Sequence, residues 1–174
     1  MMYFSAQKND TATRRALWLI AATCIALLAF ALYLQHSKSM FPCPLCIIAR
    51  YVYLGIALAC IEAALIPAAY RRYGVFFASL VALAGVGLGV YHQWILANPN
   101  VTCGIDPLQT SLNKIWPATT FPSVFRADGM CSDIYPPILG LEIPTWSLVC
   151  FVGLAVILLL TLYRHTSTSS ARTI

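Results

Sequence analysis

Charged side chains are scarce in this chain, and acidic ones are the scarcest. Lysine, arginine, aspartate and glutamate make up 10% of the 174 residues, with 11 basic residues against 6 acidic ones. A soluble domain usually carries about 25% charged residues. So few charges cannot cover the surface of a soluble globule of this size, which excludes the soluble classes of protein. The basic residues stand in short clusters between apolar runs, a distribution that argues against nucleic-acid binding.

Long apolar runs take the place of the missing charge, since 60% of the residues are hydrophobic. Crossing a hydrocarbon core of roughly 30 Å requires about 20 helical residues. Four stretches meet this length: 16–34, 44–66, 73–96 and 143–163. We therefore predict an all-α membrane protein, a bundle of four transmembrane helices that forms a single integral membrane domain over residues 1–174. The first run is longer than the apolar core of a signal peptide and is interpreted as an uncleaved helix.

The basic clusters predict how the chain crosses the membrane. Seven basic residues are expected on one side of the membrane: Lys8, Arg14, Arg15, Arg71, Arg72, Arg164 and Arg172. By the positive-inside rule both termini are cytoplasmic, and the loops at about 35–43 and 97–142 face outward. Glu62, the one acid inside a span, is expected to pair with Arg71 or Arg72. Gly85, Gly87 and Gly89 are expected to allow close helix packing in the third span.

The longer outer loop divides into two parts. Apolar residues recur at helical spacing in "PLQTSLNKIW", residues 107–116, which predicts a short helix lying on the outer leaflet. The following "PATTFPSVFRADGM", residues 117–130, holds prolines and small residues without strong periodicity. We expect this second part to be mobile.

The seven cysteines fall into two groups. Cys24, Cys60 and Cys150 lie inside apolar spans, where a thiol packs as a small hydrophobe and its thiolate is disfavoured. The other group, Cys43, Cys46, Cys103 and Cys131, lies outside the hydrocarbon or at its outer edge. An even set of cysteines in an oxidising compartment indicates disulfides.

Three interpretations of the outer group compete. A zinc site of four thiolates would favour two close pairs, whereas Cys103 and Cys131 are far apart in sequence, so we expect no metal. Static structural disulfides would make the protein a membrane scaffold, but a disulfide within CxxC encloses almost no loop and removes little chain entropy. Redox chemistry is the interpretation we favour, and the scaffold stays as its alternative.

The stretch "FPCPLCIIAR", residues 41–50, favours a reactive thiolate. Proline after Cys43 makes this cysteine a natural N-cap and places Cys46 in the first helical turn, where the helix dipole stabilises negative charge. Arg50 follows Cys46 by four residues on the same face, and a cation ~5 Å from a thiolate contributes on the order of 3 kcal/mol. The alternative for Arg50 is snorkelling to the outer headgroups. A guanidinium can also bind a carbonyl oxygen, which suits a lipid-soluble, carbonyl-bearing acceptor such as a quinone.

Several motifs together resemble the DsbB family of bacterial inner-membrane disulfide-generating proteins. They are "LQH" before the first outer loop, "PCPLCIIAR", "YH" late in the third span, "NPNVTC", "ADGMC" and "GLEIPTW" at the fourth span. Cys-x-x-Cys alone is weak evidence for the family. The resemblance is specific because the chain combines this pair with the arginine, the second cysteine pair and four spans in the same order. The resemblance implies an inner-membrane oxidoreductase that reoxidises a periplasmic DsbA-like thiol oxidase.

The resemblance also implies roles for individual residues. Cys103 would be attacked by the thiolate of the partner, Cys131 would be its partner in the loop, and Cys43 would exchange with Cys131. Cys46 would be left as the thiolate that faces ubiquinone or menaquinone, beside Arg50.

His92 matches a histidine near the quinone in the family. A neutral histidine at the membrane interface is the alternative for this residue.

Overall fold

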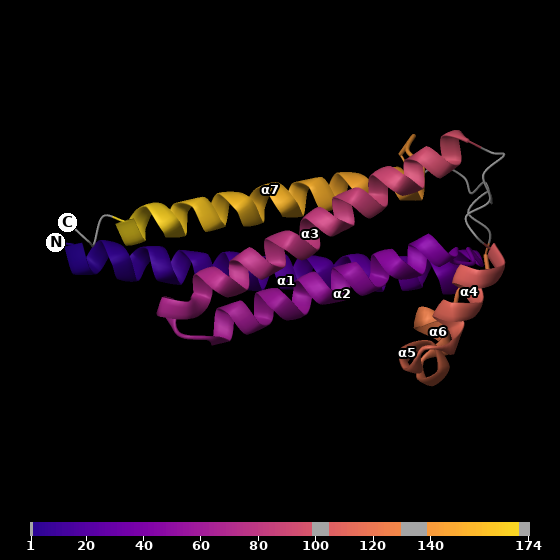
Figure 1. The fold of residues 1–174 in the computed structure, drawn as a ribbon, viewed down its shortest axis with the longest axis horizontal. Helices are drawn as coiled ribbons and strands as arrows, with labels where there is room; N and C mark the ends of the chain where they lie inside the picture. Colours follow the sequence, from indigo (N-terminus) through magenta and orange to yellow (C-terminus); the bar gives the residue numbers. More distant parts are fainter. Residues whose placement is uncertain (1, 99–104, 130–138, 171–174) are drawn as a thin grey trace.

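Four long helices run side by side and form the body of the molecule (Figure 1). The computed structural model describes residues 2–98, 105–129 and 139–170, with side chains described from Asp10 to Arg164 except at 99–107 and 130–138. The long helices are α1 (Met2–Lys38), α2 (Pro44–Leu65), α3 (Ala68–Ala97) and α7 (Ile143–Ser170). Three short helices, α4 (Ile105–Lys114), α5 (Trp116–Thr120) and α6 (Pro122–Phe125), lie at one end of the bundle, and the start of α1 and the end of α7 lie at the other (Figure 1).

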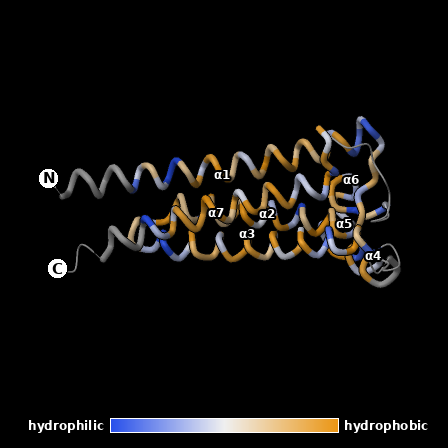
Figure 2. Tube along the Cα trace, turned by 90° about the horizontal axis from the view of Figure 1, so that it is seen from above, coloured by the Kyte–Doolittle hydropathy of each residue, from blue (hydrophilic) through white to orange (hydrophobic). Residues whose placement is uncertain are grey.

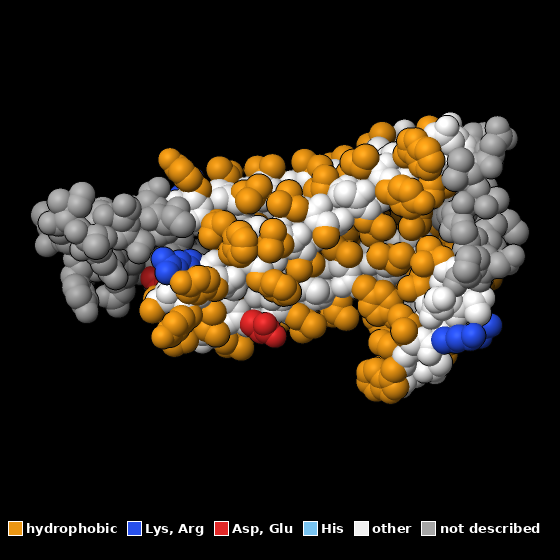
Figure 3. Space-filling model, viewed as in Figure 1, with side chains coloured by type: hydrophobic (Ala, Val, Ile, Leu, Met, Phe, Trp, Pro, Cys, Tyr) orange, Lys and Arg blue, Asp and Glu red, His pale blue; other side chains and the backbone are white. Residues whose placement is uncertain are grey.

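Each long helix contains a segment long and apolar enough to cross a membrane: Asp10–Lys38, Pro44–Leu65, Ala68–Ala97 and Ile143–Arg164. Hydrophobic residues dominate the length of the bundle (Figure 2), and apolar side chains cover the face seen in Figure 3. Such a surface is stable against lipid and not against water. The predicted all-α fold of four membrane-spanning helices with a short helix in the long loop is confirmed.

The helices pack in chain order, α1 on α2, α2 on α3 and α3 on α7. Two glycines four residues apart allow the last of these contacts. A Cβ on Gly85 would lie 2.6 Å from the ring of Phe151, and one on Gly89 would lie 2.9 Å from Leu148. A Cβ on Gly87 would have no neighbouring atom within 4 Å. Only two of the three glycines expected to support packing therefore do so, because a spacing of four keeps them on one helical face.

The core between the helices is apolar and includes two of the three cysteines assigned to the spans. Cys24 and Cys60 are fully buried with Leu17, Ile56 and Phe151. Cys150 is partly buried and packs against the same cluster. Their location agrees with the expected packing role.

Arg71 closes the end of the bundle opposite to α4–α6. Its guanidinium pairs with Asp10 and donates to the carbonyl oxygens of Ala63 and Ile66 at the end of α2, each at 3.0 Å. Among the described residues, no ion pair joins Glu62 to either arginine, and Glu62 is exposed. The pairing expected for Glu62 is wrong because α1 extends beyond its apolar run and brings Asp10 to Arg71 instead.

The middle of the long loop between α3 and α7, residues 117–125, is more helical than its sequence indicates. Residues 117–125 lie mostly in α5 and α6, each of which has proline in its first turn. Proline suits that position because the missing N–H would have no partner there. The prolines of this part therefore begin helices, and the mobility expected for it stays a prediction.

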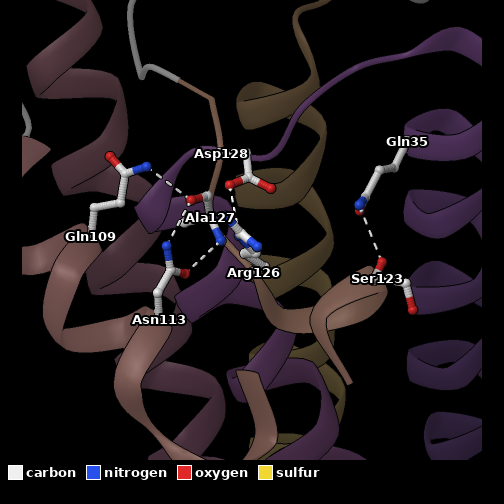
Figure 4. A network of polar contacts seen from close by, with 7 residues as sticks. All are labelled: Gln35, Gln109, Asn113, Ser123, Arg126, Ala127 and Asp128. Carbon is white, nitrogen blue, oxygen red and sulfur yellow. Dashed lines mark hydrogen bonds and ion pairs between the residues drawn. The ribbon is translucent and has the colours of Figure 1, made fainter. Parts of the chain in front are cut away.

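Side-chain amides hold this loop to its neighbours (Figure 4). Gln109 and Asn113 of α4 both donate to the carbonyl oxygen of Ala127, and the Asn113 amide oxygen accepts from the Ala127 N–H. Gln35 at the end of α1 donates to the carbonyl oxygen of Ser123 at 3.1 Å. The first three contacts join α4 to the segment after α6, and the last holds α6 beside the end of α1.

Candidate functional site

The first turn of α2 presents the CxxC pair. Cys43 is the N-cap residue in an extended conformation, with φ −74° and ψ 165°, and the helix begins at Pro44. The Cys46 N–H donates to Cys43 Sγ at 3.4 Å, and the Ile47 N–H donates to the Cys43 carbonyl at 3.1 Å. The predicted capping geometry is confirmed, and both sulfurs lie where helix N–H groups favour negative charge.

The two sulfurs form a hydrogen-bonded pair of free thiols. Cys43 Sγ donates to Cys46 Sγ over 3.0 Å. This hydrogen bond, with burial as a second cause, raises the pKa of the Cys43 thiol. In this geometry Cys43 is the donor and Cys46 the acceptor of the pair, and a sulfur that accepts such a hydrogen bond is stabilised as a thiolate.

His92 of α3 completes a cluster of three reactive side chains. Its Nε2 lies 3.9 Å from Cys43 Sγ, and the side-chain nitrogen and sulfur atoms of His92, Cys43 and Cys46 all lie within 4.8 Å of one another. His92 and Cys43 are 6% and 4% exposed. The α2–α3 hairpin brings them together, because a tight turn at its far end aligns the start of α2 with the end of α3.

Arg50 lies one turn below the sulfurs and is buried at 6% exposure. It interacts electrostatically with Cys46 and Cys43, and it donates a hydrogen bond to the carbonyl oxygen of Val124 in α6. The neighbouring Tyr51 stacks on Phe125 with ring centroids 4.7 Å apart. Snorkelling to the headgroups does not describe this buried arginine, which instead joins α2 to α6.

A cavity of about 430 Å³ lies between α1, α2, α3 and α7 toward the end of the bundle that carries α4–α6. Cys43, Cys46, Arg50 and His92 all contribute to its wall. Most of the remaining lining is apolar or aromatic: Leu27, Phe30, Ala31, Leu34, Met40, Phe41, Pro42, Ala49, Tyr53, Leu96, Leu139, Ile143, Pro144, Trp146 and Cys150, with Gln35, Glu142 and Ser147 as polar additions. A mostly apolar cavity with a few converging polar groups is typical of a small-molecule site.

Sequence reasoning missed part of this wall. Tyr53 donates to the Ser147 carbonyl at 3.2 Å and stacks on Phe151, while Trp146 lines the cavity. Spacing could have identified Tyr53, because positions 46, 50 and 53 share one helical face. Nothing in the sequence places Trp146 and Ser147 opposite that face.

Four of the six candidate site residues meet at this cavity. The remaining two, Cys103 and Cys131, lie outside the described residues.

Comparison with known proteins places the chain in a family. A family model described as "Disulfide bond formation protein DsbB" matches residues 13–161. A protein of Herminiimonas arsenicoxydans named "Disulfide bond formation protein B" is 47% identical over 155 residues, which cover 89% of this chain and 98% of that protein. A Burkholderia pseudomallei (strain 1106a) protein of the same name is 44% identical over 153 residues, 87% of this chain and 90% of that protein. A Pseudomonas putida protein, "Disulfide bond formation protein B 1", is 45% identical over 156 residues, with coverage of 87% and 91%. These matches span the CxxC pair, the arginine, the histidine and both loop cysteines, and the chain belongs to the DsbB family.

Proposed function

We propose that the protein is a quinone-dependent protein-disulfide oxidoreductase of the bacterial inner membrane. It reoxidises a periplasmic DsbA-type thiol oxidase by disulfide exchange and passes the electrons to a membrane quinone, ubiquinone or menaquinone. Both termini face the cytoplasm, and the end of the bundle that carries α4–α6 faces the periplasm. Family membership and the names of the relatives support disulfide formation.

One observation carries the proposal: Cys46 and Arg50 line the same apolar cavity within the outer half of a membrane bundle. A sulfur in this position can react with an acceptor dissolved in the lipid, which a soluble disulfide cannot do. An acceptor from the membrane is needed because a DsbA-type oxidant is stabilised in its reduced form, so its reoxidation by an ordinary disulfide is uphill.

The residues of the cavity suit a quinone. The volume of about 430 Å³ lies within the usual range of small-molecule sites, and the apolar wall suits a flat, lipid-soluble ring. Arg50 and His92 offer N–H groups that can donate to carbonyl oxygens, on the side of the cavity where the sulfurs lie. A bound quinone would accept two electrons and two protons and leave as the quinol.

The cysteines divide the transfer between two disulfides. Cys103, oxidised with Cys131, receives the thiolate of the partner and forms a mixed disulfide. The second thiol of the partner then releases the partner as a disulfide and leaves Cys103 and Cys131 reduced. Cys131 next attacks Cys43 of the oxidised CxxC pair, which frees Cys46 as a thiolate next to Arg50. Resolution by Cys103 restores the loop disulfide and leaves the CxxC pair with the two electrons.

Substitution of Cys46 tests this assignment. We expect Cys46→Ser to abolish quinone reduction, because the variant has no sulfur to pass electrons into the cavity. The same variant should still trap the partner at Cys103 as a mixed disulfide. The assay is an anaerobic titration of purified protein with a reduced DsbA-type protein, in which added quinone should be reduced in step with partner oxidation.

Cys24→Ser is the matched control, since this fully buried cysteine lies away from the cavity lining. Turnover that is unchanged in Cys46→Ser would contradict the relay. Disulfides that respond to neither partner nor quinone in the wild-type protein would favour a membrane scaffold with static disulfides instead.

A further inference from the structure

The cluster at the top of α2 has the composition of a metal site as well as that of a redox site. Two thiols at C-x-x-C spacing are a common pair of zinc ligands, and imidazole is a common third. The four cysteines at 43, 46, 103 and 131 do not have the spacing of a four-thiolate zinc site. The structure joins two of those cysteines to His92 instead, a ligand 49 positions from Cys43.

The distances are close to what a tetrahedral ion requires. Metal–sulfur bonds of ~2.3 Å and a metal–nitrogen bond of ~2.0 Å imply sulfur–sulfur and sulfur–nitrogen separations of roughly 3.8 and 3.6 Å. In the structure Cys43 Sγ lies 3.0 Å from Cys46 Sγ and 3.9 Å from His92 Nε2. Side-chain rotations that move these atoms by less than about 1 Å would create the site.

Charge favours a divalent ion. Two thiolates and one divalent cation sum to zero, and a neutral complex avoids most of the cost of placing charge in an apolar setting. The ion would exchange for the thiol protons of the pair, so no redox step is involved. Cys43, Cys46 and His92 all line the cavity, which leaves room for water at a fourth coordination position.

Arg50 opposes the ion. Its guanidinium interacts electrostatically with both sulfurs, so it would repel a second cation placed between them. The same residue that favours a thiolate therefore weakens metal binding, and its removal should strengthen it.

We infer that reduced Cys43 and Cys46 together with His92 form a three-ligand site for a divalent d¹⁰ cation of the zinc class, which excludes the disulfide while it is bound. The site exists only in the reduced state, because a disulfide offers no thiolate. The ion thus holds the pair reduced and withholds both sulfurs from exchange. This inference rests on the cluster geometry and does not require the proposed quinone chemistry.

Cadmium titration tests the site directly, because bound thiolates produce a sulfur-to-cadmium absorption band. The protein is the full chain in detergent, with Cys103→Ser and Cys131→Ser so that the loop thiols do not contribute, reduced and desalted anaerobically. We expect saturation at one Cd²⁺ per chain, displacement by Zn²⁺, and no band after oxidation of the CxxC pair.

Variants then assign the ligands. His92→Gln and His92→Ala should weaken binding by at least about 10-fold. Arg50→Gln should strengthen binding severalfold, since it removes a nearby cation. Cys24→Ser is the matched control and should leave the affinity unchanged. X-ray absorption of the zinc complex of the parent protein, which needs no His92 variant, should show two sulfur ligands and one imidazole.

Three results would overturn the inference: equal affinity in the parent and both His92 variants, a band that survives oxidation of the pair, or a zinc shell without imidazole. Each is distinct from failure of the proposed function. Quinone reduction is measured on metal-free protein with all four outer cysteines, and either property can be present without the other.

Discussion

Two arginines are buried in the part of the bundle that the structure describes, and their surroundings differ. Arg71, at the end that carries the termini, is 4% exposed and has a carboxylate and two carbonyl oxygens as partners. Arg50, near the opposite end, is 6% exposed, and within the described part of the chain it has one carbonyl oxygen and no carboxylate. Two sulfurs and an apolar cavity lie beside it instead.

Arg71 is a structural cation, whereas Arg50 has N–H donors left for a further acceptor. A buried guanidinium carries five N–H donors, and one without a carboxylate keeps much of its capacity for other acceptors. Arg71 donates to two carbonyl oxygens at the end of α2 and neutralises Asp10, so its donors are used for the structure of the bundle. Arg50 has its remaining capacity beside Cys46 and the cavity, which is the arrangement that a redox site needs. The following predictions test this contrast.

Loss of Arg50 should lower the rate of quinone reduction more than any other property of the protein. We expect Arg50→Ala to lower the rate of quinone reduction on the order of 100-fold, because a cation near the thiolate contributes about 3 kcal/mol. Partner trapping at Cys103 should change much less. The measurement is quinone reduction in single turnover beside mixed-disulfide yield, with Arg50→Lys as a control that keeps the charge and removes the planar donor group. Equal loss of both readouts would mean that Arg50 is structural like Arg71.

Loss of Arg71 should affect stability and not chemistry. Arg71→Ala removes the partner of Asp10 and leaves the Ala63 and Ile66 carbonyls with one hydrogen bond fewer each. We expect the free energy of unfolding to fall by about 2 kcal/mol. The loss is smaller than for a fully buried ion pair because the Asp10 side chain is 35% exposed. Thermal unfolding in detergent measures this cost, and turnover per folded molecule should stay unchanged.

Arg72→Ala is the control for this prediction, since Arg72 is exposed at the neighbouring position and should contribute less than about 0.5 kcal/mol. A turnover defect in folded Arg71→Ala would contradict the contrast between the two arginines.

The loop beside Arg50 should depend on smaller polar contacts. Asn113→Ala removes two hydrogen bonds to the backbone of Ala127, which is fully buried. We expect a loss of about 1 kcal/mol, visible as faster hydrogen exchange at 122–129, while the Arg71 end is unaffected. Thr119→Ala, whose hydroxyl bonds within its own short helix, is the control on a neighbouring exposed position. Equal changes at both ends of the bundle would show that the ends are not independent.

Local rules predicted much of this structure. Hydropathy located the four spans, because a bilayer requires apolar runs of a fixed length. Proline after Cys43 predicted the start of α2 and the cap, and the four-residue spacing predicted that Arg50 lies below Cys46. Each of these inferences uses contacts within one helix, which sequence spacing determines.

Contacts between helices could not be derived in the same way. Nothing local sets the register of α3 against α2, so the approach of His92 to Cys43 followed from no spacing within a helix, and only the family resemblance suggested that His92 lies near the site. The pairing of Asp10 with Arg71 depends on how far α1 continues past its apolar run. The weak apolar periodicity of residues 117–130 gave no sign of α5 and α6, in which Pro117 and Pro122 stand in the first turn.

Gly129 lies against the backbone just before the CxxC pair. The N–H groups of Asp128 and Gly129 both donate to the Pro42 carbonyl, and a Cβ on Gly129 would lie 2.3 Å from the carbonyl oxygen of Phe41. A single methyl group at this position would therefore push the segment around Gly129 away from the segment just before the CxxC pair, without substituting any sulfur, charged group or cavity side chain. Position 129 therefore allows the packing between these two segments to be changed on its own, with the groups that line the cavity left as they are.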